Sequence, residues 1–414
     1  MRIVIVVADS LRADAVGAYG GGADTPTLDR IAAEGTRFDT VFSSSPWTLP
    51  SLAAMLTGCH GHRVGLVNWL QAWPAGFPTV FDHLAAAGWE CASFVFDPRY
   101  LFTGLHAAGV LGSSRDEDPM WTFLRSRPAR DQVVFVHHWG THIPYVAGAM
   151  PWDAWQPACD ALISLAGAGG AQRAKVRELY RRAVRRFSEE WLPRLLGCLD
   201  EAGGETALLV TADHGETWGE RLRPGARLAG VFDLHGNALF DESLRVPLVL
   251  RGAGVPAGRV VAGLARSVDI APTVLELAGV DAPAAVDGIS LLGAAATGSR
   301  APAARVVAAC NRTVAEMVAL SPAEPGPRDA WHRFAMRTID RKWIVDDRQA
   351  RQAFDLHADP GETSPLDGAA PGWENGWLAL ETEVARAGLV PIPGDVLDEE
   401  RRKAEAVRRG VVRR

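Results

Sequence analysis

Two acidic residues and a histidine follow apolar runs in this sequence, in positions where a metal ion could bind. Asp9 comes directly after the run Ile3–Ala8, and Asp213 and His214 come shortly after the run Thr206–Thr211. Carboxylate oxygens and imidazole nitrogens are ligands that zinc takes in proteins. An Asp-His pair at the end of a buried strand indicates a functional site. Asp9 has an equal alternative role in a turn or as a helix cap, because Asp9-Ser10 also suits a helix start.

A threonine in the segment Ser45–Gly58 is the candidate nucleophile. Thr48 precedes Pro50 and a run of small and apolar residues typical of a helix. The amide groups and dipole of a helix N-terminus favour an anion. A threonine hydroxyl is a weak nucleophile, but metal coordination can deprotonate it at neutral pH. The alternative is that Thr48 or Ser51 only caps the helix.

Three histidines within six residues form a further candidate group, just past an apolar strand. The spacing of His138 and His142 would suit one face of a helix, but the glycine and proline around them favour a loop. A loop can still bring both imidazoles to one metal ion. The alternative is stacking around Trp139. His235, in a glycine-flanked loop, is either a further ligand or a structural histidine.

The elements that would position these residues alternate between strands and helices. Buried strands are predicted at Arg2–Val7, Cys91–Phe96, Gln132–His137, Thr206–Thr211 and Val246–Arg251. Helices are predicted at Thr79–Ala87, Val268–Ala278 and, as one or two helices, Ala171–Ala202. This alternation predicts an α/β fold with a parallel sheet covered on both faces. Ligand sites in such folds form where the strands end.

The composition and the pattern of predicted elements change after residue 295. The Ala/Gly/Pro-rich stretch Gly293–Ala304 is typical of a linker. Short strands are then predicted at Arg305–Ala309, Arg333–Thr338, Lys342–Val345 and Gln352–Leu356, followed by a helix at Gly376–Ala387. The expected organisation is a catalytic α/β domain over 1–295 and a C-terminal subdomain over 296–414, with a small antiparallel sheet and a terminal helix.

Composition narrows the class of protein. The 414 residues are 48% hydrophobic, and the net charge of -6 gives no sign of disorder or of nucleic-acid binding. The basic cluster Arg401–Arg414 is interpreted as a solvated terminal helix. The five cysteines are scattered without metal-type spacing, which is typical of free thiols in a reducing compartment. No secretory signal or membrane-length apolar run is visible, so the prediction is a cytoplasmic protein that does not bind membranes.

In this order and spacing, these elements resemble the alkaline-phosphatase/sulfatase superfamily. The resemblance covers the first strand and metal acid, the helix that follows it, the nucleophile turn, the second metal motif and a C-terminal signature. These segments are Val6–Asp14, Thr25–Gly35, Ser45–Gly58, Asp213–Glu216 and Asp355–Thr363. The resemblance implies an alkaline-phosphatase-like fold, with a largely parallel central sheet sandwiched by helices and a small C-terminal α+β subdomain.

The nucleophile turn departs from the sulfatase pattern. Sulfatases carry a Cys or Ser that is converted to formylglycine, followed by a proline and an arginine. Here the corresponding residues are Thr48, Pro50 and Leu52. Threonine has a methyl group on its β-carbon and cannot give that aldehyde. Ser10 also stands where sulfatases have a second aspartate. The threonine is similar instead to the nucleophile of the superfamily's phosphodiesterases, phosphonoacetate hydrolases and phosphoethanolamine transferases.

Carried onto this sequence, the resemblance implies one or two metal sites. The first would use Asp9, Thr48, Asp213 and His214. The second would use His142 and His235, with His138 where two-metal relatives have an aspartate. The expected metal is one or two Zn²⁺, with Mn²⁺ as the alternative, and the expected catalytic residues are Thr48, His142 and His235.

The expected function is hydrolysis or transfer of a phosphate ester or phosphonate through a covalent intermediate on Thr48. The alternatives are sulfate-ester hydrolysis without formylglycine, or a non-catalytic binding protein. The expected partner is a small-molecule substrate, and the sequence carries no signal for an oligomeric state. Pocket-shaping loops are expected at Leu66–Gly76, Asp97–Ser114 and Tyr145–Pro157.

Overall fold

The fold is described from a computed structural model of the chain. It covers residues 1–387, apart from 68–70, 72, 74–76, 96–109, 114–116, 147–149, 221–234, 237, 312–331, 347–350 and 367–370. Two of the predicted pocket loops, Leu66–Gly76 and Asp97–Ser114, lie largely outside these residues, and the predicted terminal helix Arg401–Arg414 lies wholly outside them.

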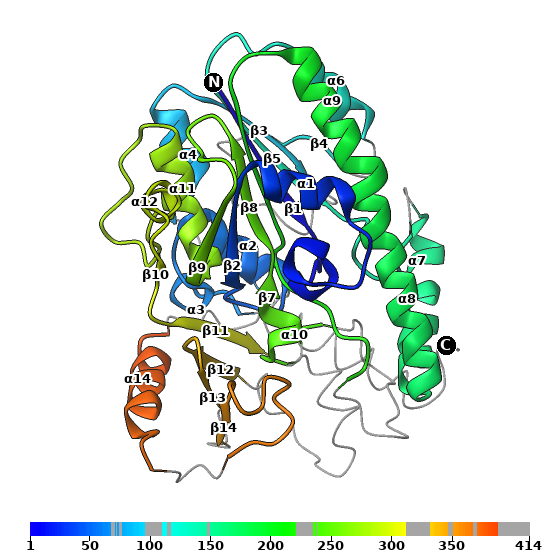
Figure 1. The fold of residues 1–414 in the computed structure, drawn as a ribbon, viewed down its shortest axis with the longest axis vertical. Coiled ribbons are helices and arrows are strands. Elements are labelled where there is room, and N and C mark those ends of the chain that lie inside the picture. The colour runs from blue at the N-terminus through cyan, green and yellow to red at the C-terminus, as the bar shows by residue number, and fades with distance from the viewer. Residues whose placement is uncertain are drawn as a thin grey trace.

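A large twisted sheet forms the centre of the molecule (Figure 1). Its strands, in spatial order, are β10 (Ala301–Pro302), β9 (Arg259–Arg266), β2 (Thr36–Phe42), β8 (Leu248–Gly252), β6 (Thr206–Thr211), β1 (Arg2–Ala8), β5 (Gln132–His138), β3 (Glu90–Val95) and β4 (Val110–Ser113), with β7 (Arg245–Val246) paired to β2. The five residues Ile3–Val7 are fully buried at the middle of this sheet, as their continuous apolar run predicts.

The sheet is mostly parallel, so the prediction of a largely parallel sheet is confirmed. β1 pairs in parallel with both β5 and β6, which brings the ends of these three strands to the same edge. The exceptions are β8, which runs antiparallel to β6 and to β2, and the short β7, which runs antiparallel to β2. Strands β2 and β9 have no counterpart among the predicted elements. Their burial alternates with exposed or half-buried positions, which gives a weaker signal than a continuous apolar run.

Helices cover both faces of the sheet, as predicted. One layer holds α1 (Pro26–Glu34), α6 (Asp118–Arg125), α7 (Trp152–Gly167), α8 (Gly170–Arg186) and α9 (Leu192–Ala202). The other holds α2 (Thr48–Thr57), α3 (Gly61–Val64), α4 (Val80–Ala86), α11 (Ile270–Leu277) and α12 (Leu292–Thr297). Short turns of helix complete the chain at η1 (Ala13–Ala15), η2 (Gly17–Tyr19), η4 (Ser267–Asp269) and α10 (Asp241–Leu244). Helix α7 begins inside the segment Tyr145–Pro157 that was predicted to be a loop.

The segment Ala171–Ala202, predicted as one or two helices, forms two helices joined by a π-helical turn. This turn, η3 (Phe187–Trp191), lies between α8 and α9. The extra residue of a π turn shifts the face that a helix presents, and such turns occur frequently at functional sites. Phe187 and Trp191, four residues apart, lie with ring centroids 5.5 Å apart beside His138 at the end of β5.

A second sheet follows the large one and is antiparallel throughout. It consists of β11 (Val306–Asn311), β12 (His332–Arg337), β13 (Arg341–Asp346) and β14 (Arg351–Asp355), with helix α14 (Glu374–Ala385) packed on it (Figure 1). The predicted linker Gly293–Ala304 is wrong in part. Its alanines are strong helix formers and build α12, which ends where Gly298 takes a φ of 70°. Strand β10 then pairs with β9 of the large sheet.

A buried ion network joins the large sheet to the small one. Lys342 on β13 is fully buried, and its Nζ lies 2.9 Å from Asp241 and 2.6 Å from Glu362. Arg337 on β12 pairs with the same Asp241 at 3.0 Å and stacks over the Phe42 ring at 4.1 Å. Burial disfavours the charge of Asp241, but Lys342 and Arg337 outweigh it and hold its pKa at about 2.

Replacing Lys342 by methionine is expected to destabilise the protein by about 3–5 kcal/mol, because the buried Glu362 loses its cation and the half-buried Asp241 keeps only Arg337. Arg351→Met is the control, since that arginine pairs with Glu381 at the surface and its loss should cost less than about 1 kcal/mol. Urea unfolding followed by tryptophan fluorescence measures both. Equal losses in the two variants would contradict this account of the junction.

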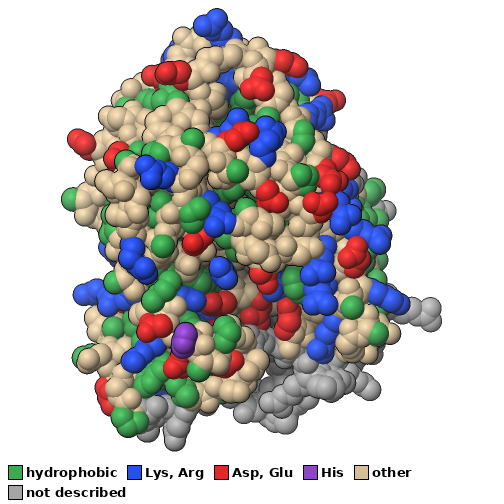
Figure 2. All heavy atoms as spheres, viewed as in Figure 1, with side chains coloured by type: hydrophobic (Ala, Val, Ile, Leu, Met, Phe, Trp, Pro, Cys, Tyr) green, Lys and Arg blue, Asp and Glu red, His purple; other side chains and the backbone are tan. Residues whose placement is uncertain are grey.

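The surface mixes the two signs of charge. Figure 2 shows acidic and basic side chains interspersed over one whole face, without a large area of a single sign. Within the described ranges, no helix combines the length and hydrophobicity that crossing a membrane requires.

Candidate functional site

Two carboxylates meet at the ends of the neighbouring strands β1 and β6. Asp9 and Asp213 are both fully buried. Ser10 has a φ of 60°, a left-handed conformation that is uncommon for a residue with a side chain. This turn points the Ser10 N–H at Asp213 Oδ1 (3.1 Å), which also accepts the N–H of His214 (2.8 Å). Asp213 Oδ2 has no hydrogen-bond partner among the described residues and faces Asp9.

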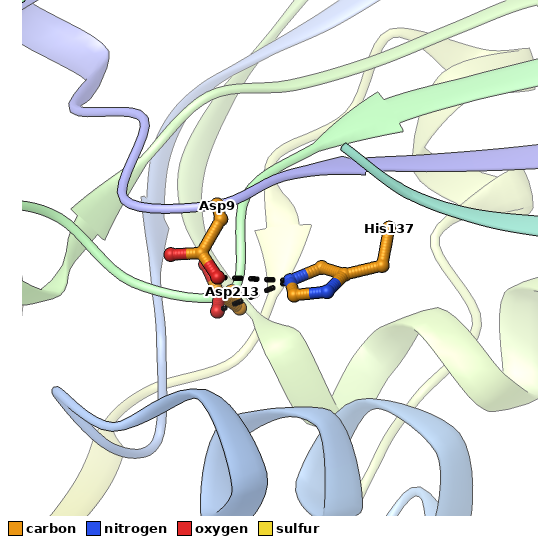
Figure 3. A group of neighbouring side chains, drawn as sticks. All are labelled: Asp9, His137 and Asp213. Atoms are coloured by element: carbon orange, nitrogen blue, oxygen red, sulfur yellow. Dashed lines mark ion pairs between the residues drawn. The ribbon is translucent and has the colours of Figure 1, made fainter. Parts of the chain in front are cut away.

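His137, the next-to-last residue of β5, completes this group (Figure 3). Its Nε2 lies 3.0 Å from Asp9 Oδ2 and 3.7 Å from Asp213 Oδ2, without the geometry of a hydrogen bond to either. Asp9, His137 and Asp213 form a group whose ligand atoms all lie within 4.8 Å of one another. Sequence reasoning did not select His137.

His214 and Thr48 adjoin the same two carboxylates. His214 Nε2 lies 3.4 Å from Asp213 Oδ2 and 3.8 Å from Asp9 Oδ1. Thr48 Oγ1 lies 3.2 Å from His214 Nε2 and 3.5 Å from Asp9 Oδ2. Because His214 Nδ1 contacts the carbonyl oxygen of Gly215 at 2.8 Å, Nδ1 carries the proton and Nε2 is the acceptor nitrogen. The structure therefore brings Asp9, Thr48, Asp213 and His214 together.

These donors fit a small divalent cation. Ligands about 2.0–2.2 Å from a tetrahedral zinc ion are separated from one another by roughly 3.3–3.6 Å. The donor-to-donor distances given above run from 3.0 to 3.8 Å. Buried carboxylate and imidazole atoms without hydrogen bonds are costly unless a ligand satisfies them. The donor set of carboxylate, imidazole and hydroxyl suits Zn²⁺ or Mn²⁺.

The electrostatics of the group favour a cation between the carboxylates. Burial opposes charge on Asp9, but the nearby imidazoles of His142, His137 and His214 hold its pKa well below the usual range. Burial also opposes charge on His137, yet Asp213 and Asp9 raise its pKa to about 9. Burial lowers the pKa of His214, which favours the form that can act as a metal ligand through Nε2.

The turn that carries Thr48 is held by serine hydroxyls. Helix α2 begins at Thr48 itself, which leaves the N–H groups of its first residues without partners inside the helix. Ser51 donates a hydrogen bond to the carbonyl oxygen of Asp213, and its hydroxyl lies 2.8 Å from that of Ser43. Leu52, where sulfatases have an arginine, is fully buried in the core. This turn therefore connects the candidate nucleophile directly to the strand end that carries Asp213.

His142 and His235 lie side by side next to His214. The ring of His235 is 5.0 Å from that of His142 and 4.4 Å from that of His214. His142 Nδ1 contacts the Ile143 carbonyl oxygen at 2.5 Å, and His235 Nδ1 contacts Glu216 at 3.2 Å. Both acceptors require a proton on Nδ1, so both rings use Nε2 as acceptor. The three imidazoles thus form one continuous row beside the carboxylates.

The loop that carries His235 packs closely on the residue before Thr48. Gly236 takes a φ of 86°, and a Cβ there would lie 2.2 Å from the Trp47 ring, so a larger residue has no room. The Trp47 ring makes an edge contact with His235 at 5.7 Å. Trp139 stacks on His142 at 3.9 Å, with Trp155 next to both. Aromatic rings therefore fix two imidazoles of the row, His235 and His142.

His138 lies apart from this row. Its ring contacts Phe187 and Trp191, with centroid distances of 4.8 and 4.7 Å. Successive residues of a strand point to opposite faces, so His137 and His138 cannot both face the carboxylates. Burial, together with the charge of His137, lowers the pKa of His138 to about 3. The structure places this histidine in an aromatic cluster with the π turn.

The mixed sheet, its two helical layers and the buried Asp/His/Asp group together define an alkaline-phosphatase-like α/β protein. The sulfatase family profile matches residues 2–94 and 117–280, more than half of the chain, so the chain belongs to the sulfatase family of the alkaline phosphatase superfamily. It is 24% identical over 480 aligned residues to N-acetylglucosamine-6-O-sulfatase of Bacteroides thetaiotaomicron, covering 89% of this chain and 83% of that protein.

Solved structures share the fold at low sequence identity. A 2-O GAG sulfatase superposes with a TM-score of 0.71 at 17% identity, covering 99% of this chain and 93% of that one. The phosphonate monoester hydrolase of Agrobacterium radiobacter superposes with a TM-score of 0.68 at 17% identity, covering 92% and 95%. The names of these similar proteins point mainly to sulfatases, with phosphonate monoester hydrolases among the structural neighbours.

Proposed function

We propose that this chain is a metal-dependent hydrolase of a singly charged oxyanion ester, with sulfate monoesters as the first substrate class. The sequence alone favoured phosphate esters and phosphonates. The sulfatase family membership and the names of the relatives instead support its alternative, sulfate-ester hydrolysis without formylglycine. A phosphonate monoester is the second candidate, supported by the structural neighbours with that activity and by the threonine at position 48.

The proposed preference for substrates with a single negative charge rests on the charges of the residues at the site. Two carboxylates, Asp9 and Asp213, would face one divalent cation, and their charges cancel. In the described part of the chain, no lysine or arginine pairs with these carboxylates, with His214 or with Thr48. A sulfate monoester and a phosphonate monoester each carry a single negative charge, whereas a phosphate monoester brings a second one. A second buried charge without a partner is costly.

The metal ion would be held by Asp9, His137, Asp213 and His214, and when bound it would lower the pKa of the Thr48 hydroxyl and polarise the ester oxygens. Thr48 Oγ1 would then form a bond to sulfur or phosphorus while the bond from that atom to the ester oxygen breaks. The proton lost by the Thr48 hydroxyl would pass to Nε2 of the imidazole row and from there to the leaving oxygen, which departs as an alcohol. A water molecule hydrolyses the Thr48 ester and releases the inorganic oxyanion.

The remaining residues bind and orient. The N–H groups of Thr48 and Leu49, the first two residues of α2, would bind the oxyanion next to Thr48, whereas Pro50 has no N–H and the Ser51 N–H donates to the Trp47 carbonyl oxygen. His142 and His235 would move the proton to the leaving oxygen, since each holds its Nδ1 proton against a fixed acceptor and exchanges protons through Nε2. In one variant of this proposal, His142 and His235 hold a second metal ion. In another, the group on Thr48 is transferred to an acceptor other than water.

A panel of four esters with one leaving group tests the proposal. Three of them, 4-nitrophenyl sulfate, 4-nitrophenyl phenylphosphonate and bis(4-nitrophenyl) phosphate, carry one negative charge each. The fourth, the monoester 4-nitrophenyl phosphate, carries two. With Zn²⁺ or Mn²⁺ supplied, we expect kcat/KM for the best singly charged ester to exceed that for the phosphate monoester by at least about tenfold. A preference for the phosphate monoester would overturn the single-charge proposal. No turnover of any ester would favour the non-catalytic binding alternative.

The cytoplasmic location is part of the proposal, and fractionation of the native host tests it.

A further inference from the structure

A polar cavity that none of the candidate site residues lines lies where the large sheet and its helices meet the small sheet. Its volume is about 610 Å³. It is lined by His60, Arg63, Arg266, Asp287, Arg305, Val307, Glu383 and Arg386. These residues come from both parts of the fold, because His60 and Arg63 lie at α3 of the catalytic unit while Glu383 and Arg386 lie at the end of α14. The cavity therefore lies between elements packed on the large sheet and elements of the small sheet.

The arginines of this cavity keep most of their donors uncommitted. Among the described residues, Arg305 and Arg386 each donate one hydrogen bond, both to Glu383 Oε1 and both at a long 3.4 Å. Arg63 donates one hydrogen bond, to Asp287. A guanidinium group has five N–H donors, so each of these three side chains can bind a further acceptor. Arg266 differs, since Asp269 and the Asp287 carbonyl oxygen already occupy it.

Positive charge is in excess around the cavity. Three arginines with uncommitted donors face two carboxylates, Asp287 and Glu383, and the charge of Arg266 is matched by the buried Asp269. Burial lowers the pKa of His60 well below its usual value, and the nearby His62, Arg266 and Arg63 lower it further. Beside it, His62 is almost completely buried, with neither ring nitrogen hydrogen-bonded in the described residues. His62 Nε2 lies 3.9 Å from Glu383 Oε2. The Arg63, Arg305 and Arg386 side chains are 37–64% exposed, so their remaining donors face solvent and an anion could take the place of that water.

We propose that this cavity is a second anion-binding site, for a phosphate or sulfate group carried either by the free inorganic ion or by a small organic ester. Oxyanions match the planar fork of arginine, and three such forks converge here. The volume exceeds what one oxyanion fills, which leaves space for an organic remainder. The proposal does not depend on the reaction at Thr48.

An anion in this cavity would also touch the support of the nucleophile turn. His60 Nδ1 lies 3.1 Å from the hydroxyl of Ser44, four residues before Thr48. The Ser44 carbonyl oxygen accepts the N–H of Ala309 on β11 at 3.0 Å. The site therefore connects the small sheet, the arginines and the turn, and a bound anion should stabilise their junction.

Calorimetric titration with inorganic phosphate, inorganic sulfate and glucose 6-phosphate tests the proposal, with thermal unfolding as a second measurement. The titrations use Asp213→Asn, which weakens binding at the metal centre, as the background. We expect one anion site to persist there and to raise Tm. Adding Arg305→Gln and Arg386→Gln should weaken this binding by at least about tenfold, because two charge-assisted hydrogen-bond donors are lost. Both side chains are largely exposed, so the variant should fold.

The matched control is Arg125→Gln with Arg182→Gln in the same background, which removes the same charge from surface pairs on α6 and α8. Its anion affinity should stay within about twofold. Absence of any anion binding in Asp213→Asn would overturn the proposal, and so would equal affinities in the pocket variant and the control. Binding of phosphate and sulfate alone would identify the free ion as the ligand. Tighter binding of glucose 6-phosphate would identify an organic ester.

Discussion

Thr48→Ala is expected to lower kcat by at least about a thousandfold, the range seen when an acting nucleophile is deleted. Thr48 Oγ1 lies 3.2 Å from His214 Nε2 and 3.5 Å from Asp9 Oδ2, so its hydroxyl would join the metal ligands directly. Thr48→Ala leaves the other proposed metal ligands, Asp9, Asp213, His137 and His214, in place. Metal should therefore still bind, and the loss should lie in the chemical step. Steady-state kinetics together with zinc titration separates the two effects.

Thr48→Ser is the control for this prediction. Serine keeps the hydroxyl but loses the methyl group that restricts the threonine rotamer, so partial activity should remain. A trapped sulfuryl or phosphoryl adduct, detected by mass spectrometry on the peptide containing Thr48, would support the covalent step. Near-normal turnover in Thr48→Ala would falsify the covalent mechanism. A metal-bound water would then be the attacking group, and Thr48 would have only a structural role at the start of α2.

The sequence was informative about the fold wherever apolar runs are continuous. Strand Thr206–Thr211 was predicted with its observed bounds, and β1 and β5 were each extended by one residue in the structure. These strands are buried on both faces, which leaves an uninterrupted signal. Strand β9 was missed because glycine and exposed positions interrupt its pattern. Helix α12 was taken for a linker because its alanines and glycines also suit a flexible segment.

The acidic residues could be selected from sequence because strand ends are visible in it, whereas the choice among the histidines depends on register. In the structure Val7 pairs with both His137 and Thr211. Paired residues of parallel strands point to the same face, and residues two positions further along point there too. Val7, His137 and Thr211 therefore share a face with Asp9 and Asp213. A shift of one residue would have selected His138 instead, and sequence alone does not give the pairing.

The pair His137 and His138 gives the second large prediction. His137→Ala is expected to weaken Zn²⁺ binding by at least about a hundredfold. Loss of a residue that merely supports a ligand typically costs 10–100-fold, and a ligand should matter more. His137 Nε2 lies 3.0 Å from Asp9 Oδ2 and 3.7 Å from Asp213 Oδ2. Without this imidazole, a metal ion would keep only Asp9, Asp213, His214 and Thr48 as ligands.

His138→Ala is the matched control, because it removes the same side chain one residue later on the opposite face of β5. Its ring packs on Phe187 and Trp191, so the variant should lose about 1–3 kcal/mol of stability and keep its zinc affinity within about threefold. Titration of the metal-free proteins with Zn²⁺ and with Mn²⁺, alongside urea unfolding, measures both quantities. A weaker metal affinity in His138→Ala than in His137→Ala would mean that His138 is a ligand after all. The ring would then have to leave the aromatic cluster and cross to the face of Asp9, which requires the end of β5 to rearrange when metal binds.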